Sequence, residues 1–288
     1  MAVTPAGGRL AGYLRLVRFQ HTLFALPFAY VGMLLAAGAL PGWSTFLWIT
    51  LAMVGARSAS MALNRVIDAR IDARNPRTAG REIPTGAVKA REALVLAAAG
   101  FLALALAGWA LNPLTVALLP VAVAFLTLYP YAKRFTWTCH AWLGLTVGAA
   151  AAGGWIAVTG AFAPATWALW AAVALWIAGF DVIYALLDED FDRRVGLHSV
   201  PVRFGTQGAR VIAIGAHVAS WVCFALAAIL AGFGPIAWLG LIVVAGVFAY
   251  AHALVARRGA DDALRAFDAN LWVGAVMLAA VAADVLLR

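Results

Sequence analysis

Asn64-Arg-Val-Ile-Asp68-Ala-Arg-Ile-Asp72-Ala-Arg-Asn-Pro-Arg-Thr78 ends a long apolar run that begins near Trp43. Asn64, Asp68 and Asp72 recur at every fourth residue, so on a helix their side chains stack along one face. Three oxygen-bearing side chains in one column can hold a hard cation such as Mg²⁺. Five arginines surround this column: Arg65, Arg70, Arg74, Arg77 and Arg81. They would suit an anionic ligand such as phosphate. Taken alone, the stretch also fits the mixed charges of any helix that leaves a membrane at the headgroup level.

A second stretch, Asp181-Val-Ile-Tyr184-Ala-Leu-Leu-Asp188-Glu-Asp-Phe-Asp192, repeats the pattern after another long apolar run. Tyr184, Asp188 and Asp192 fall 120 positions after the three members of the first column, which hints at an internal repeat. Asp181 lies one helical turn earlier on the same face. Chance rarely repeats both the spacing and its place at a helix end. The two stretches therefore predict two halves of one site.

The composition is that of a membrane protein. Of the 288 residues, 65% are hydrophobic and only 12% are charged, whereas a soluble domain has about a quarter of charged residues. The mean hydropathy of +0.90 agrees. The net charge of +8 does not indicate a nucleic-acid partner, because the basic residues lie between apolar runs rather than on one soluble face. Cys139 and Cys223 have no metal-binding spacing, and residues 1–16 contain no removable signal.

Apolar segments of about 17–25 residues, long enough to cross a bilayer, can be drawn nine times. The predicted spans are 19–40, 44–67, 92–111, 113–132, 138–160, 165–187, 208–231, 235–256 and 266–287. Turn signals at Asn112-Pro113 and Gly234-Pro235 separate two of the pairs, because Pro cannot continue a helix. The fold class that we expect is therefore an all-α bundle of nine transmembrane helices, with residues 1–288 as a single domain.

The distribution of Lys and Arg predicts the orientation of this bundle. Basic residues precede the first span and occupy the loops after the second, fourth, sixth and eighth spans, whereas the other four loops have none. By the positive-inside rule, the amino terminus and the even-numbered loops are cytoplasmic and the carboxyl terminus is outside. We therefore expect a multi-pass protein of the cell inner (plasma) membrane. Its site faces the cytoplasm, under cap loops at about 68–91 and 188–207.

Two classes of function can use such carboxylates. Two Mg²⁺ ions that bridge a diphosphate would account for both signs of charge, since the metals need oxygen ligands and the diphosphate needs metals and arginines. A secondary transporter or channel for protons or cations is the alternative. Its site, however, should lie near the middle of the bilayer, with access from both sides. The carboxylates here lie at one end of the spans, which favours the diphosphate.

Further polar residues have two readings each. Arg57 lies two turns before Asn64, inside the span. Its guanidinium either reaches back to the interface or receives a carboxylate or phosphate in a pocket. His21 is either an interfacial histidine or a substrate contact. Lys133 and the following Arg134 anchor the fourth span by default and could also hold phosphate. His198 either caps its loop or accepts a proton from the cytosolic side.

These residues resemble those of a known family. Asn64-Arg-x-x-Asp68-x-x-x-Asp72, followed by Asn-Pro-Arg-Thr and Arg81-x-x-Pro84-x-Gly86, is similar to the first aspartate-rich motif of the UbiA family of intramembrane aromatic prenyltransferases. Asp181-x-x-Tyr184-Ala-x-x-Asp188-x-x-x-Asp192 resembles the second motif. Tyr129-Pro-Tyr-Ala-Lys133-Arg134-Phe-Thr136 resembles the end of the family's fourth span. The resemblance covers nearly the whole chain and implies a helical bundle whose cavity opens laterally to lipid.

The resemblance also implies a reaction. A polyprenyl diphosphate is bound through Mg²⁺, its diphosphate departs, and the allylic cation attacks a phenolic acid ortho to the hydroxyl. It assigns Asn64, Asp68 and Asp72 to one metal ion, and Asp188 and Asp192 to the other, so the four aspartates are the catalytic carboxylates. The residues that it places at the diphosphate are Arg65, Arg77, Lys133 and Tyr184. The residues that we expect at the aromatic acceptor are Arg57, His21 and Asp181. The partners are thus the two substrates and the bilayer, with no obligate protein partner.

One departure from the family pattern concerns Arg65, where many members have Asp. Versions with Asn-Arg, Asn-Pro-Arg-Thr and the stretch His21-Thr-Leu-Phe-Ala-Leu-Pro27 resemble a bacterial quinone-pathway branch. That branch includes enzymes that prenylate 4-hydroxybenzoate for ubiquinone and dihydroxynaphthoate for menaquinone. The resemblance slightly favours the naphthoate of the futalosine route. The sequence determines neither the acceptor nor the prenyl chain length.

Overall fold

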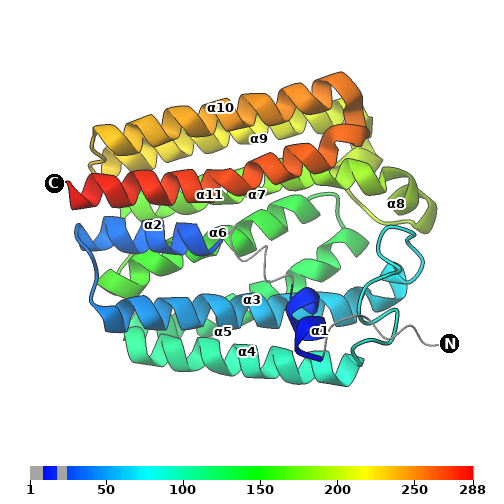
Figure 1. Ribbon diagram of the computed structural model, residues 1–288, viewed down its shortest axis with the longest axis horizontal. Helices are drawn as coiled ribbons and strands as arrows, with labels where there is room; N and C mark the ends of the chain where they lie inside the picture. Colours follow the sequence, from blue (N-terminus) through cyan, green and yellow to red (C-terminus); the bar gives the residue numbers. More distant parts are fainter. Residues whose placement is uncertain (1–8, 18–24, 288) are drawn as a thin grey trace.

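The structure is a computed structural model that describes residues 9–17 and 25–287, and these contain helices and no β-strand (Figure 1). The α-helices are α1 (Arg9–Leu16), α2 (Leu26–Ala37), α3 (Trp43–Asp72), α4 (Ala90–Leu111), α5 (Pro113–Leu128), α6 (Cys139–Thr159), α7 (Pro164–Ala185), α8 (Glu189–Val195), α9 (Val200–Leu230), α10 (Pro235–Arg258) and α11 (Ala263–Leu286). Short 3₁₀ helices occupy Tyr129–Arg134, Leu186–Asp188 and Gly259–Asp262. The predicted all-α class is confirmed.

The described residues contain 8 helices that are long and apolar enough to cross a membrane. They correspond to the second to ninth predicted spans. Helix α2, with 12 residues, covers the later part of the first predicted span, whose beginning lies outside the described residues. The chain is therefore a polytopic membrane protein. The count of nine spans and the orientation of the two termini stay predictions.

The two turns that were expected at Pro residues are present. Pro113 and Pro235 each stand in the first turn of a helix, where a missing backbone N–H leaves no hydrogen bond unmade. The side chain of Asn112 caps α5 by accepting a hydrogen bond from the Thr115 backbone N–H at 3.0 Å. Before α10, the Asp284 carboxylate of α11 accepts a hydrogen bond from the Gly234 N–H at 2.7 Å. Local capping thus separates helices that hydropathy alone would merge.

Small residues bring α2 and α6 into backbone contact. A Cβ atom added to Gly154 of α6 would lie 1.9 Å from the Ala29 carbonyl oxygen of α2, and one added to Gly32 of α2 would lie 2.1 Å from the Ala151 carbonyl oxygen of α6. Close approach at small residues is how helices associate in lipid, where burial of apolar surface gives little driving force. This packing fixes α6, and with it the residues at the start of α6 that reach the site.

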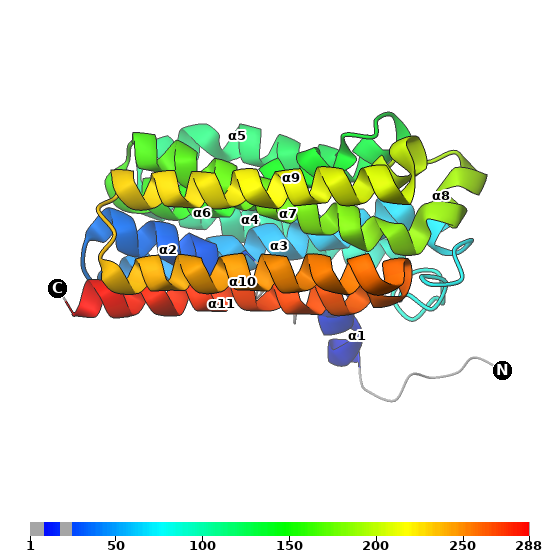
Figure 2. The same ribbon diagram turned by 90° about the horizontal axis from the view of Figure 1, so that it is seen from above.

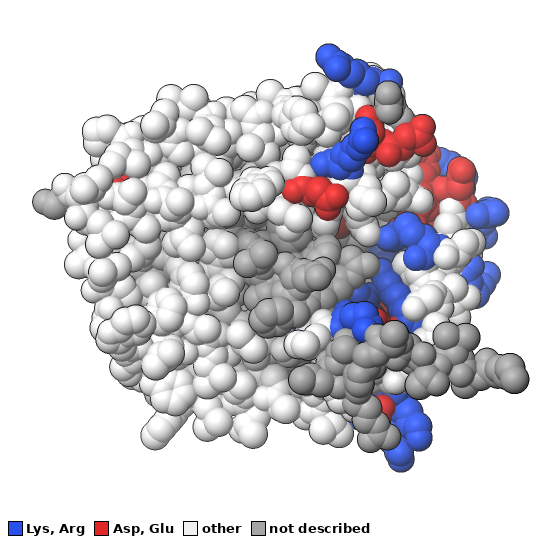
Figure 3. All heavy atoms as spheres, in the orientation of Figure 1, with Lys and Arg blue, Asp and Glu red and all other residues white. Residues whose placement is uncertain are grey.

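The long helices run along the long axis of the molecule, and the segment 73–89 and α8 lie together at one end (Figures 1 and 2). In Figure 3 the acidic and basic side chains gather at that end, while the remaining visible surface is almost free of them. Helix α3 continues to Asp72 and α9 begins at Val200, so the two predicted cap loops include helical residues. This charged end holds the candidate site.

Candidate active site

Two cavities meet inside the charged end of the bundle. A cavity of about 220 Å³ is lined largely by polar and charged side chains of α3, α7, α8 and the connecting segments, and we call it the polar cavity. A second cavity of about 470 Å³ extends from it along the bundle between mostly apolar side chains, and we call it the apolar cavity. The residues that line both are Asn64, Arg81, Tyr129, Leu143, Asp181 and Tyr184. We call these six residues the junction, because they form the boundary between the polar cavity and the apolar cavity.

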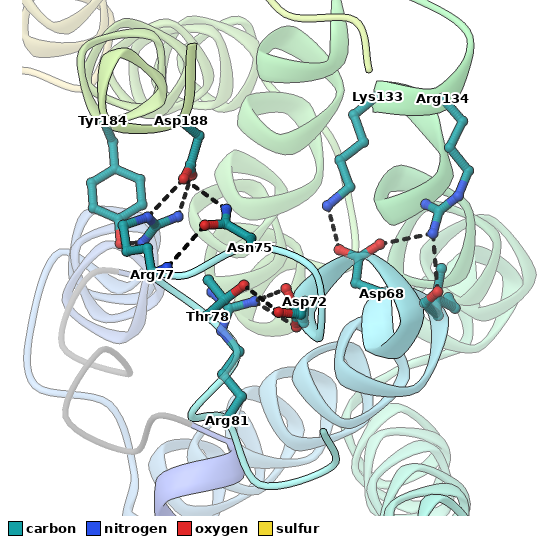
Figure 4. Close-up of polar contacts among 11 residues, drawn as sticks. Asp68, Asp72, Asn75, Arg77, Thr78, Arg81, Lys133, Arg134, Tyr184 and Asp188 are labelled. Atoms are coloured by element: carbon teal, nitrogen blue, oxygen red, sulfur yellow. Dashed lines mark hydrogen bonds and ion pairs between the residues drawn. The ribbon is translucent and has the colours of Figure 1, made fainter. Parts of the chain in front are cut away.

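The first motif forms the predicted column on the last turns of α3, where Asp68 and Asp72 are buried. Asp68 accepts hydrogen bonds from Lys133 and, at 2.9 Å, from Arg134, which both come from the 3₁₀ helix Tyr129–Arg134 (Figure 4). Asp72 is paired through both carboxylate oxygens with the Arg81 Nη1 atom at 2.7 Å. Burying a carboxylate without a partner costs free energy, and these ion pairs offset that cost.

The segment after α3 turns back over the column. Thr78 Oγ1 donates a hydrogen bond to the Asp72 carbonyl oxygen at 3.1 Å, which satisfies one carbonyl at the helix end. Asn75 accepts a hydrogen bond from the Arg77 backbone N–H at 2.9 Å, a local turn that directs its Nδ2 atom to Asp188 at 2.9 Å. The Asn-Pro-Arg-Thr sequence thus joins the first motif to the second.

The second motif does not stay on one helix. Helix α7 ends at Ala185, so that Tyr184 is on α7, Asp188 closes the 3₁₀ helix Leu186–Asp188, and Asp192 is on α8. All three side chains nevertheless line the polar cavity, so the motif supplies its half of the site despite the break.

Arg77 links the two motifs (Figure 4). Its guanidinium donates hydrogen bonds to both Asp188 oxygens and, through Nη1, to the Tyr184 hydroxyl at 2.7 Å. Burial acts to lower the pKa of Arg77, but the bonds to Asp188 and Tyr184 outweigh burial and raise the pKa above its usual value. Arg77 therefore stays charged and holds the segment 73–89 against the end of α7.

The carboxylates fit Mg²⁺ by chemistry, although not by their present arrangement. Asp68, Asp72, Asp188, Asp192 and Asn64 all line the polar cavity, and they are oxygen ligands of the kind that Mg²⁺ takes. Within residues 9–17 and 25–287, no group of three or more His, Cys, Asp or Glu side chains is arranged to hold a metal ion. Asp68, Asp72 and Asp188 are instead paired with basic side chains, namely Lys133, Arg134, Arg81 and Arg77.

The other predicted site residues divide between the two cavities. Lys133 lines the polar cavity, and Arg57 and the buried Arg65 line the apolar one. Asp181 and Tyr184 stand at the junction. His21 lies outside the described residues. The structure thus places Arg57 beyond the carboxylates, as its position two turns earlier on the helix predicted.

Two residues at the site were not predicted. Asn75 bonds to Asp188, and His140 at the start of α6 contacts Asp181, with 2.7 Å between His140 Nδ1 and Asp181 Oδ2. Asn75 stands inside the quoted motif and could have been proposed from it. No spacing in the sequence indicates His140, because its partner lies 41 residues away.

Comparisons with known proteins agree with the motifs. A sequence model described as the UbiA prenyltransferase family matches residues 25–274. The chain is similar to the 4-hydroxybenzoate octaprenyltransferase of Alkalilimnicola ehrlichii, with 35% identity over 88% of this chain and 86% of that protein. It is 32% identical to the protein of the same name from Albidiferax ferrireducens over 99% of this chain and 97% of that one.

Solved structures share the fold. A UbiA homolog from Aeropyrum pernix K1, solved in its apo form, superposes with a TM-score of 0.85 at 36% identity, over 92% of this chain and 98% of that one. A UbiA homolog from Archaeoglobus fulgidus bound to GPP and Mg²⁺ has a TM-score of 0.73 at 19% identity, over 94% of this chain and 99% of that one.

Proposed function

This chain belongs to the UbiA prenyltransferase family, and we propose that it transfers a polyprenyl group from a polyprenyl diphosphate to the ring of a hydroxylated aromatic acid in quinone biosynthesis. As a member of this family the chain is an enzyme. The alternative, a secondary transporter or channel for protons or cations, has no support.

The meeting of the two cavities carries this proposal. A polyprenyl diphosphate has a highly charged head and a long hydrocarbon tail, and few other metabolites need both a chamber with four aspartates and an apolar one next to it. The polar cavity takes the diphosphate and the apolar cavity takes the first isoprene units. The bond between the first tail carbon and the diphosphate then lies at the junction, beside Asn64, Asp181 and Tyr184.

Mg²⁺ would be held by Asn64, Asp68 and Asp72 on one side of the polar cavity and by Asp188 and Asp192 on the other. When bound, Mg²⁺ supplies positive charge that stabilises the departing diphosphate. The protein itself supplies more positive charge around the same head group, through Arg77, Lys133 and Arg81.

Arg77, Lys133 and Arg81 interact with the carboxylates when the site is empty and with the diphosphate when it is filled. In the structure they neutralise the carboxylates, and a diphosphate that enters the polar cavity offers them stronger anionic oxygens. Arg77, Lys133 and Tyr184 then contact the diphosphate, while their carboxylate partners become available as ligands. Arg65 approaches from the apolar side. The same side chains thus stabilise both the empty and the filled site.

The aromatic acid enters the apolar cavity, where its carboxylate needs a cationic partner. Arg57 lines this cavity and can supply a planar pair of donors. Asp181 at the junction faces the reacting end of the ring, and His21 is retained as a contact for the same substrate. The names of the curated relatives support 4-hydroxybenzoate. Dihydroxynaphthoate, which the sequence motifs slightly favour, is the competing acceptor.

The reaction then needs few groups from the protein. The donor C–O bond breaks and its electron pair leaves with the diphosphate. A pair of ring electrons forms the new C–C bond, and the ring carbon loses its proton. The apolar walls keep water away from the cation until the ring reacts. We place this site at the cytoplasmic face of the inner membrane, because Lys and Arg side chains gather at this end of the molecule (Figure 3).

The test is an acceptor assay with purified protein in detergent and Mg²⁺. Geranylgeranyl diphosphate is offered with 4-hydroxybenzoate, with dihydroxynaphthoate, and with benzoate as an acceptor lacking the hydroxyl. We expect one prenylated product from a hydroxylated acid and none from benzoate. The absence of any prenylated product from both hydroxylated acids, with donors of several chain lengths, would refute the proposal.

A further inference from the structure

His140 is a buried histidine that touches the junction from outside the two aspartate-rich motifs. It stands in the first turn of α6 with 5% of its surface exposed, and it lines the polar cavity. Its Nδ1 atom lies 2.7 Å from Oδ2 of Asp181 on α7. Its Nε2 atom lies 3.2 Å from the backbone nitrogen of Val200, the first residue of α9.

These two contacts determine where the imidazole proton is. A backbone N–H can only donate, so Nε2 must accept the hydrogen bond from Val200 and carries no proton. The proton of the neutral ring therefore sits on Nδ1 and is donated to Asp181 Oδ2. Val200 is anchored in turn, because Ser199 caps α9 and is buried. The Val200 backbone N–H thus orients the His140 ring, and the His140 ring orients the Asp181 carboxylate.

Asp181 has a position that no other carboxylate of the described residues shares, since it lines both cavities. Its side chain is 25% exposed. His140 holds one of its oxygens, and Oδ1 accepts no hydrogen bond from the residues that the structure describes. Three of the four carboxylates proposed to bind Mg²⁺ are different, because Asp68, Asp72 and Asp188 are paired with Lys or Arg. Asp181 therefore differs from these three in being oriented by an imidazole nitrogen.

We propose that His140 is a positioning residue that orients Asp181 so that Asp181 Oδ1 takes the proton released when the aromatic ring is prenylated. This inference rests on the proposed function, which places the new C–C bond at the junction. In that step the ring carbon gives up its proton to Oδ1, and the C–H electron pair returns to the ring and restores aromaticity. A carboxylate paired with Lys or Arg would be a weaker proton acceptor, and no Lys or Arg of the described residues is paired with Asp181.

A purely structural role for His140 predicts something else. The ring joins the starts of α6 and α9 to α7, so a structural residue would affect stability and all kinetic constants together. A positioning residue lowers kcat while the donor KM and the folded state are maintained. The two roles therefore differ in a measurable way.

The experiment uses two variants of nearly the same shape, His140→Asn and His140→Leu. The Asn amide nitrogen occupies the place of Nδ1 and still donates to Asp181, whereas Leu cannot. Asp181→Asn removes the proton acceptor, and His252→Leu, on α10 and away from both cavities, is the control. Thermal unfolding in detergent, kcat and both KM values are measured with geranylgeranyl diphosphate and the hydroxylated acid that the wild type accepts.

We expect His140→Leu to lower kcat by about 10- to 100-fold, with the donor KM within about twofold of wild type. His140→Asn should keep kcat within about fivefold, and His140→Leu should cost nothing further when Asp181 is already Asn. Wild-type kcat in His140→Leu, or equal losses in His140→Leu and His140→Asn, would overturn the inference. So would an effect confined to the donor KM. Should the Leu variant not fold, His140→Ala replaces it with the same expectation. An inactive wild type would instead refute the proposed function.

Discussion

At the scale of single residues, the site consists of carboxylates whose partners in the structure are Lys and Arg side chains. Asp68 and Asp72 are buried, so each must have either a basic side chain or a metal ion beside it. In the structure Lys133 and Arg81 fill that need. The same cations would be attracted to the diphosphate of the proposed donor.

Removing one metal-binding carboxylate should therefore be severe. We predict that Asp68→Ala lowers the rate of prenyl transfer by at least about 10²-fold, since it removes a proposed ligand of Mg²⁺ and leaves Lys133 and Arg134 without their anion. The matched control is Asp190→Ala, an exposed carboxylate next to the second motif that lines neither cavity. Initial rates at saturating Mg²⁺ compare the two. A fully active Asp68→Ala enzyme would contradict the assignment.

Arg57 gives a second prediction. It lies about 10 Å along α3 from Asn64, at about 1.5 Å per residue, and it lines the apolar cavity rather than the polar one. Arg57→Lys keeps the charge but loses the planar pair of donors, so the acceptor KM should rise more than the donor KM. Arg70→Lys, exposed on the same helix, is the control. A rise in the donor KM alone would move Arg57 to the diphosphate site, and no change would favour the interfacial reading.

The sequence could predict the residues that act through local spacing and not those that act through distant contacts. Asn64, Asp68 and Asp72 could be grouped because the helical period alone places them on one face. His140 and Asn75 depend on partners 41 and 113 residues away, and no periodicity connects them. The contact of His140 depends on how α6 packs against α7, and that of Asn75 on how the segment 73–89 turns back toward Asp188.

At the scale of elements, packing of small residues determines where the site residues point. Helix α6 carries His140 at its start and contacts α2 through Gly154. Hydropathy predicted both helices, and Pro and Gly predicted their separating turns. Hydropathy could not predict that α7 ends at Ala185 and that a 3₁₀ helix follows within the second motif. The reason is that the sequence Leu186-Leu-Asp188 contains no residue that breaks a helix.

The neighbouring glycines of α6 provide a matched pair. Gly154→Ala should destabilise the protein by about 1–3 kcal/mol, because its new methyl group would overlap the Ala29 carbonyl oxygen. Gly153→Ala should be neutral or stabilising by up to about 1 kcal/mol, since nothing lies within 4 Å of the added Cβ. Thermal unfolding of both variants in the same detergent measures the difference. Equal unfolding temperatures would show that the contact between α2 and α6 does not limit stability.

At the scale of the whole molecule, the chain is a membrane bundle whose charged side chains gather at one end (Figure 3). At that end the polar cavity joins the apolar cavity inside the bundle. This arrangement suits the proposed amphipathic donor, which has a charged head and an apolar tail. The twin motifs converge because α3 and α7 end at the same face of the bundle (Figure 1). The central claim is that their carboxylates hold Mg²⁺ for prenyl transfer.

The most direct measurement is the metal dependence of product formation by the purified protein. Geranylgeranyl diphosphate and the accepted aromatic acid are incubated with the enzyme after treatment with EDTA, and Mg²⁺ is then added back in steps. We predict that EDTA abolishes the prenylated product and that Mg²⁺ restores it, because without the metal ions the diphosphate charge is not neutralised as it leaves. Undiminished product formation in EDTA would contradict the account.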